Sequence, residues 1–137
     1  MQTDAQRIAD DLTTAYATGG PAVTAAFEAA LAERVELVHR PAQPQDGVYD
    51  RAVLVAAQTA QADRIASVLK DFRQTASISA GADEVTVRLA ISGTLPDGTA
   101  IAISGTDVLA VADGRVHRMV SVFESDQLTA LVAALVR

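Results

Sequence analysis

Asp107 is the residue whose position raises the clearest chemical question. It lies in TDVLAVADGRVHRMVSVF, residues 106 to 123, which has the pattern of two strands joined by an Asp-Gly turn. Because strand side chains alternate, Asp107 shares a face with Leu109 and Val111, where an unpaired carboxylate is costly. Burial there would raise its pKa and let it donate a hydrogen bond, whereas a neighbouring cation would lower its pKa.

Arg88 is the predicted partner of this carboxyl group. If Asp97-Gly98 is a two-residue hairpin loop, counting back along both strands pairs Arg88 with Asp107 on one face. We expect the same face to carry Ala90, Ser92, Ile101, Ile103, Gly105 and Leu109. A bulge at either Gly93 or Gly105 would shift this register by one residue. The sequence therefore leaves two roles open for Asp107, a protonated donor and half of an ion pair.

The strand after the Asp113-Gly114 turn has two different faces. One face mixes apolar and polar groups, as a pocket wall does, and consists of His117, Met119, Ser121 and Phe123. The other combines apolar residues with two charges and consists of Val116, Arg118, Val120, Val122 and Glu124. The pattern predicts a pocket for a small apolar molecule on one side of the sheet and a homodimer interface on the other.

The two histidines and a second arginine complete the set of candidates. His39 and His117 could carry a proton in catalysis or could be structural histidines of the core or surface. Arg40, before Pro41, is either a solvated strand-end charge or, with Arg88, a bidentate holder of an acidic ligand. No His-x-x-x-His motif or acidic cluster accompanies the histidines and the chain has no cysteine, so we predict no metal and no cofactor.

The elements that must position these residues follow from the hydrophobic periods. Spacings of three and four predict helices from Asp4 to Ala17, from Pro21 to about Glu33, over residues 50 to 70, and after a cap at Ser125 or Asp126. Alternation predicts strands over 35–40, 72–79, 84–95, 99–112 and 115–124. The last four form an antiparallel meander, and helices must cover one of its faces, so the fold class is α+β.

Composition limits the function classes. A chain of 137 residues is predicted to form a single domain over residues 1–137. A formal charge of −6 argues against nucleic acid and anionic membranes as partners. No apolar run approaches the length of a membrane span, and the polar start MQTDAQRIADD has no secretory character, so a cytoplasmic location is the default expectation.

The element order, ending in DGRVHRMVSVFESDQL, resembles the nuclear transport factor 2-like superfamily, which includes ketosteroid isomerases, limonene epoxide hydrolases and SnoaL-type polyketide cyclases. The resemblance covers nearly the whole chain, and its most specific part is Asp-Val-Leu-x-Val-x-Asp-Gly-Arg-Val. It implies a cone-shaped curved sheet packed against N-terminal helices.

The resemblance also implies site residues. It places Asp107 where ketosteroid isomerases have a protonated aspartate, and Tyr16 where they have the tyrosine that shares the oxyanion hole. Their general base immediately precedes a proline, and here Arg40 has that position and cannot abstract a proton at neutral pH. His39 could substitute, although it points to the opposite side of an ideal strand.

The epoxide hydrolases give a second comparison. Arg88 matches their pocket arginine, but their two water-activating aspartates fall on Ala90 and Ser121, so we do not expect that chemistry.

Two hypotheses remain open. In the first, the protein is an isomerase or cyclase in which Tyr16 and Asp107 polarise the oxygen of a small carbonyl compound and either His39 or His117 moves the proton. In the second, it is a non-catalytic module that binds a small ligand or dimerises, with Arg40 and Arg88 holding an acidic group.

Overall fold

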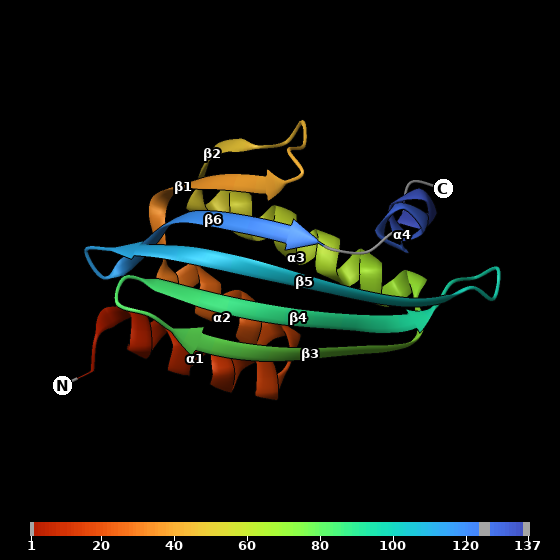
Figure 1. Cartoon of the computed structure of the whole chain (residues 1–137), viewed down its shortest axis with the longest axis horizontal. Helices are drawn as coiled ribbons and strands as arrows, with labels where there is room; N and C mark the ends of the chain where they lie inside the picture. The colour runs from red at the N-terminus through yellow and green to blue at the C-terminus, as the bar shows by residue number, and fades with distance from the viewer. Residues whose placement is uncertain (1, 124–126, 136–137) are drawn as a thin grey trace.

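The fold is a curved, unclosed sheet of six strands with helices on one face (Figure 1). The structure, a computed structural model, describes residues 2–123 and 127–135, so the predicted caps at Ser125 and Asp126 lie outside the described residues. The elements are α1 Asp4–Thr18, α2 Gly20–Ala30, β1 Leu31–Arg40, β2 Gly47–Asp50, α3 Arg51–Val68, β3 Lys70–Ala80, β4 Glu84–Thr94, β5 Ala100–Ala112, β6 Arg115–Phe123 and α4 Gln127–Leu135. The predicted α+β class is confirmed.

The sheet has the strand order β2-β1-β6-β5-β4-β3. The predicted antiparallel meander corresponds to β3 through β6 and is confirmed. The whole sheet is mixed rather than antiparallel, because β1 pairs in parallel with β6. The second helix ends at Ala30, earlier than predicted, and the short strand β2 was not foreseen.

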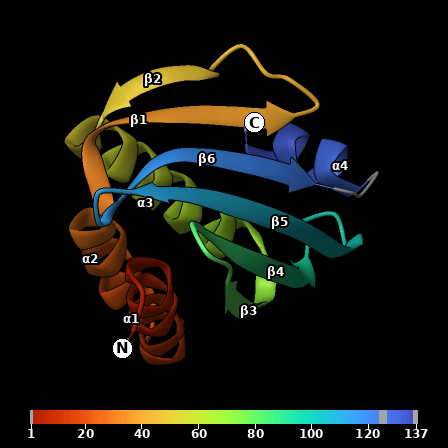
Figure 2. The same ribbon diagram turned by 60° about the vertical axis from the view of Figure 1, so that its left-hand side comes forward.

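The helices cover the face of the sheet that becomes the core. The side chain of Thr3 caps α1 by accepting a hydrogen bond from the Gln6 backbone N–H at 3.1 Å. The buried face of α1 consists of Ala5, Ile8, Ala9, Leu12 and Ala15, at helical spacing. Figure 2 shows α1, α2 and α3 on the same side of the sheet, which defines that side as the inner face. None of the described helices is both long and apolar enough to cross a membrane.

Two apolar clusters pack against this inner face. The first joins α1 and α2 to one half of the sheet and includes Leu12, Val87, Leu109, Val116 and Met119. The second joins the end of α3 and helix α4 to the other half and includes Leu69, Ile101, Ile103, Leu131 and Leu135. Along β5, Gly105 and Asp107 lie between the two clusters, so the carboxyl group is placed where one apolar region ends and the next begins.

The predicted pairing of Arg88 with Asp107 is wrong. Leu95 and Thr99 close the β4–β5 loop, with the Leu95 N–H donating to the Thr99 carbonyl at 2.8 Å, so the loop is one residue longer than predicted. Asp107 therefore lies opposite Val87, and Arg88 lies opposite Thr106 on the outer face. A shift of one residue moves every β4 side chain to the other face, so Ala90 and Ser92 are also on the outer face.

A bulge on β6 corrects the prediction for its two faces. Ala110 pairs with Arg118 and Val111 with Val116, which leaves His117 as the extra residue. Val116 is fully buried in the core and so cannot belong to a subunit interface, while the side chain of His117 is exposed. Beyond the bulge the prediction holds, because Met119 and Ser121 face inward. Val120 and Val122 are on the outer face, where the homodimer interface stays a prediction.

Candidate functional site

One row of residues crosses the inner face and carries its polar groups. His39 of β1 is paired with Ser121 of β6, Ser121 with Asp107 of β5, and Asp107 with Val87 of β4. We call these four residues the inner row. Ser121 is 7% exposed. Among the described residues, it is the only polar one that is buried. His39 and Asp107 are far apart in the sequence. Strand pairing places them in the same row, separated only by β6.

Asp107 accepts a hydrogen bond from Ser121, and its burial changes its pKa. The Ser121 hydroxyl donates a hydrogen bond to Asp107 Oδ1 at 2.6 Å. Burial raises the pKa of Asp107 above its ordinary value of 3.8, although the Ser121 hydrogen bond and a positive charge on His39 both act to lower it. Because Arg88 is on the outer face, it does not neutralise this carboxyl group. Asp107 thus keeps its proton to a higher pH than an exposed aspartate.

Tyr16 lies in the last turn of α1 and packs against the first apolar cluster. Burial raises the pKa of Tyr16 to about 12, and the nearby charge of Asp107 contributes to the rise. The phenol therefore stays protonated and able to donate throughout the neutral range. Asp107 is therefore near enough for its charge to act on the Tyr16 phenol, and Tyr16 itself packs against the apolar cluster that borders Asp107 on the inner face.

His39 has a carboxylate partner that the sequence did not reveal. Its Nδ1 lies 2.5 Å from Asp46 Oδ1, and its backbone N–H donates to Asp46 Oδ2 at 3.1 Å. The hydrogen bond to the His39 side chain holds the pKa of Asp46 below its ordinary value. Asp46 lies in the loop that returns from β1 to β2. The only sequence signal for it was the turn character of the Asp46-Gly47 pair.

The remaining predicted site residues lie in different places. Met119 is buried next to the inner row, and Phe123 ends β6 opposite Gly105, with its side chain outside the described part of the structure. Arg40 and Arg88 belong to an outer row that is completed by Val122 and Thr106, and both arginines are exposed. Both arginines therefore lie on the opposite face of the sheet from Asp107.

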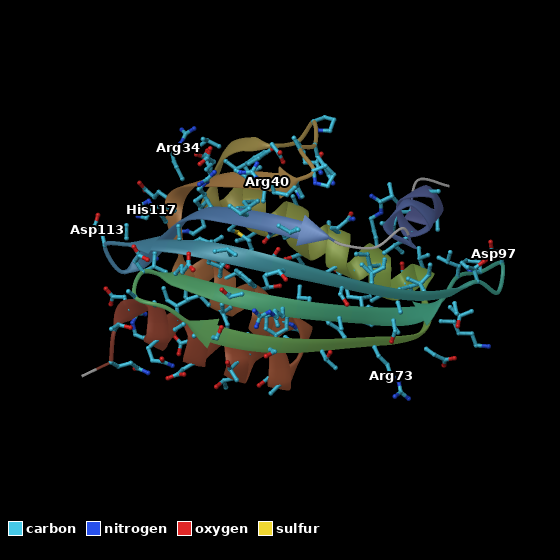
Figure 3. The ribbon with its side chains drawn as sticks, in the orientation of Figure 1. Arg34, Arg40, Arg73, Asp97, Asp113 and His117 are labelled. Carbon is cyan, nitrogen blue, oxygen red and sulfur yellow. The ribbon has the colours of Figure 1, made fainter. Side chains whose placement is uncertain are left out.

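His117 is also separated from the inner row. Its Nε2 donates to the Ala112 carbonyl at 3.0 Å, which fixes the ring over the β5–β6 turn. Figure 3 shows His117 near Asp113 at one end of the sheet and Arg40 farther along. A surface groove there is lined by Ala32, Glu33, Arg34, Arg51, Asp113, Arg115 and His117. The structure therefore places His117 in a charged surface groove and His39 in the inner row.

The inner row and its neighbour Tyr16 carry complementary chemical groups. Tyr16, His39 and Asp107 are each half-buried, whereas Ser121 and Val87 are buried. The Tyr16 phenol can donate a proton to a ligand oxygen, Asp107 keeps its proton to a higher pH than an exposed aspartate, and the His39 imidazole lies across Ser121 from Asp107. The described residues contain no group of three or more acidic or histidine side chains that could hold a metal ion.

Comparisons with known proteins agree with this architecture. Neither a protein-family model nor a curated protein sequence matches the chain. Among solved structures, an NTF2-like protein of unknown function from Burkholderia pseudomallei is 14% identical with a TM-score of 0.64, covering 96% of this chain and 98% of its own.

Two other neighbours bear functional names. A candidate SnoaL-like polyketide cyclase from Jannaschia sp. CCS1 is 11% identical with a TM-score of 0.62, and the match covers 98% of this chain and 96% of that one. A candidate ketosteroid isomerase from Kribbella flavida is 19% identical with a TM-score of 0.59, covering 89% of this chain and 78% of that one. The predicted resemblance is confirmed at the level of the fold, and this chain has the nuclear transport factor 2-like fold.

Proposed function

We propose that the protein is an isomerase or cyclase that acts on a small apolar carbonyl compound at the inner row. The observation that carries the proposal is the position of Asp107 on the inner face between two apolar clusters, near the buried Tyr16 phenol, where burial raises the pKa values of both groups. Tyr16 holds its proton throughout the neutral range, and the raised pKa of Asp107 favours the protonated form that the proposed role needs. In this role the two side chains bind the carbonyl oxygen of the substrate.

The chemistry would proceed through an enolate. A base removes a proton from the carbon next to the carbonyl group, the C–H electrons form a C=C bond, and the carbonyl π electrons move to oxygen. Hydrogen bonds from Tyr16 and Asp107 strengthen as negative charge develops on that oxygen, which is the condition for lowering the barrier. Returning the proton to another carbon gives isomerisation, and attack by the enolate carbon on an electrophile within the same molecule gives cyclisation.

His39 is the proposed proton carrier. It lies in the inner row, while His117 is held over the β5–β6 turn by the Ala112 carbonyl. Two strand spacings separate the backbones of His39 and Asp107, roughly 10 Å, so a small molecule bound by its oxygen at Asp107 can present a neighbouring carbon to the imidazole.

The flanking clusters indicate the substrate class. Leu109 and Met119 lie beside the inner row on one side, and Ile103 lies on the other side along β5. A ligand held at Asp107 would therefore place its carbon skeleton against apolar side chains. This arrangement favours a substrate with one polar oxygen and a largely apolar body.

Binding of substituted phenols tests the oxygen site without knowledge of the substrate, because a phenolate resembles an enolate in charge and shape. We expect Tyr16→Phe and Asp107→Ala each to weaken binding about tenfold or more in calorimetry, since a hydrogen bond to a charged group contributes about 1.5–3 kcal/mol. Asp107→Asn should retain most of the affinity, because an amide can still donate.

The control for this experiment is Arg88→Gln, which changes the outer row alone. Absence of phenol binding in the wild-type protein, or equal affinities in the wild type and Asp107→Ala, would contradict the proposal. Equal losses in Asp107→Ala and Asp107→Asn would indicate an ionic role for Asp107 instead.

Deuterium exchange at the carbon next to the carbonyl of small cyclic ketones, measured by NMR in D2O, tests proton transfer. We expect exchange above the buffer rate and a loss of about 100-fold in His39→Gln, the usual size of a general base contribution. Phenol binding without any exchange would instead support a non-catalytic binding module.

A further inference from the structure

We infer that Asp46 is a positioning residue that fixes His39 in one tautomer, with the proton on Nδ1 and with Nε2 left free to act as the base. The inference deepens the proposed function and rests on it for the use of Nε2 in catalysis. The tautomer itself follows from contacts in the β1–β2 loop and can be measured independently.

The carboxylate of Asp46 is fixed from three directions. Oδ2 accepts hydrogen bonds from the backbone N–H groups of His39 at 3.1 Å and Gln43 at 3.2 Å, while Oδ1 lies 2.5 Å from His39 Nδ1. Two backbone donors leave the carboxylate little freedom to move away from the ring. The loop therefore presents a pre-oriented acceptor to one particular nitrogen of His39.

The direction of the third hydrogen bond follows from the chemistry of the acceptor. The lowered pKa of Asp46 keeps its carboxyl group ionised at neutral pH, and an ionised carboxylate has no proton to donate. His39 Nδ1 must then carry the hydrogen. In a neutral imidazole only one nitrogen is protonated, so Nε2 has a free electron pair.

Nε2 of His39 makes no hydrogen bond within the described part of the structure. Among the described residues, the hydrogen bond of the ring is made through Nδ1, and the His39 side chain is 15% exposed. A positive charge on His39 would lower the pKa of the Asp107 carboxyl group. The geometry thus gives the inner row an imidazole whose Nε2 is available as a base and whose Nδ1 donates a hydrogen bond to Asp46.

His117 provides an internal reference with the opposite tautomer. Its Nε2 is 3.0 Å from the Ala112 carbonyl, and a carbonyl oxygen can only accept, so Nε2 of His117 carries the proton. The chain has two histidines in all. The two rings are therefore expected to give distinct and opposite patterns in one spectrum.

Long-range 1H–15N correlation NMR of uniformly labelled protein, at a pH where both rings are neutral, distinguishes the tautomers. In the wild type we expect a protonated Nδ1 for His39 and a protonated Nε2 for His117. In Asp46→Ala we expect the proton of His39 to move to Nε2, because the acceptor is gone, while His117 does not change. Asp46→Glu should restore part of the wild-type pattern.

Asp63→Ala is the matched control, since Asp63 is an exposed carboxylate on α3 and should alter neither ring. A wild-type His39 protonated on Nε2, or a His39 pattern unchanged in Asp46→Ala, would overturn the inference. The spectrum needs no substrate, so a correct tautomer with no ketone exchange would count against the proposed reaction alone. Where exchange is found, Asp46→Ala should slow it at least tenfold while phenol binding is retained.

Discussion

Two adjacent rows on the same four strands have opposite character. The inner row holds His39, Ser121, Asp107 and Val87, and the outer row holds Arg40, Val122, Thr106 and Arg88. Each outer residue is one step along its strand from an inner one. The carboxyl group in the inner row has a raised pKa and is hydrogen-bonded to a serine, while the two guanidinium groups in the outer row are exposed to solvent.

The difference shows that cover by the helices, together with strand register, decides what these residues can do. A carboxyl group on the helix-covered face and beside two apolar clusters loses hydration, which raises its pKa. Arginines on the uncovered face keep their hydration. If β4 were shifted by one residue, Arg88 would enter the inner row and the same Asp107 would become an ion-pair partner.

The largest loss of stability is expected for an inner-face residue of β5, compared with its outer-face neighbour. Leu109 is fully buried on the inner face and Val108 is half-buried on the outer face. Leu109→Ala should lower the free energy of unfolding by about 2–5 kcal/mol, and Val108→Ala by about 1 kcal/mol or less. Urea denaturation measures both. Equal losses would mean that the outer face is covered as well, as it would be in a homodimer.

A smaller effect is expected from Ser121→Ala, which removes the donor to Asp107 Oδ1. The variant should be about 1 kcal/mol less stable at neutral pH. The pKa of Asp107 should rise further, because its ionised form loses a hydrogen bond. Urea denaturation and an NMR titration check the two parts, and an unchanged pKa would show that the serine does not stabilise the carboxylate.

The pH dependence of stability distinguishes Asp107 from an ordinary surface aspartate. Its pKa in the folded protein is raised above 3.8, so its contribution is fully present below pH 3.8 and is lost as the pH rises through the folded pKa. The wild type should therefore lose stability relative to Asp107→Asn over that window. Paired urea titrations across this range test the sign, and the reverse trend would indicate a paired carboxylate.

The smallest effect is expected in the outer row. Arg88→Ala should change the free energy of unfolding by no more than about 0.5 kcal/mol, because it removes an exposed charge without an inner partner. A loss of several kcal/mol in urea denaturation would point to an Arg88–Asp107 ion pair and to the alternative register.

The sequence predicted the elements better than it predicted their neighbours. Strict alternation at Val85, Val87 and Leu89 identified β4, because a half-buried strand needs it. The same pattern could not give the length of the loop from Pro96 to Gly98, and one extra residue there exchanged the two faces of β4. Alternation likewise cannot reveal a bulge, so His117 was assigned to the wrong face.

The candidate site shows the same limit. Asp107 stood out because a carboxylate on an apolar face is unusual, and the family resemblance added Tyr16. Asp46 gave no such signal, because its partner His39 lies across a loop and no periodic pattern connects them. The parallel pairing of β1 with β6, which brings His39 beside Ser121, is likewise a property of the tertiary fold alone.

The most direct test of the account is an NMR titration of the Asp107 carboxyl carbon in the wild type and in Arg88→Ala. We predict a pKa above 3.8 in the wild type and the same value in the variant, because burial sets it and the arginine is on the other face. A wild-type pKa at or below 3.8 that rises when Arg88 is removed would show an ion pair and would contradict the proposed oxygen-binding site.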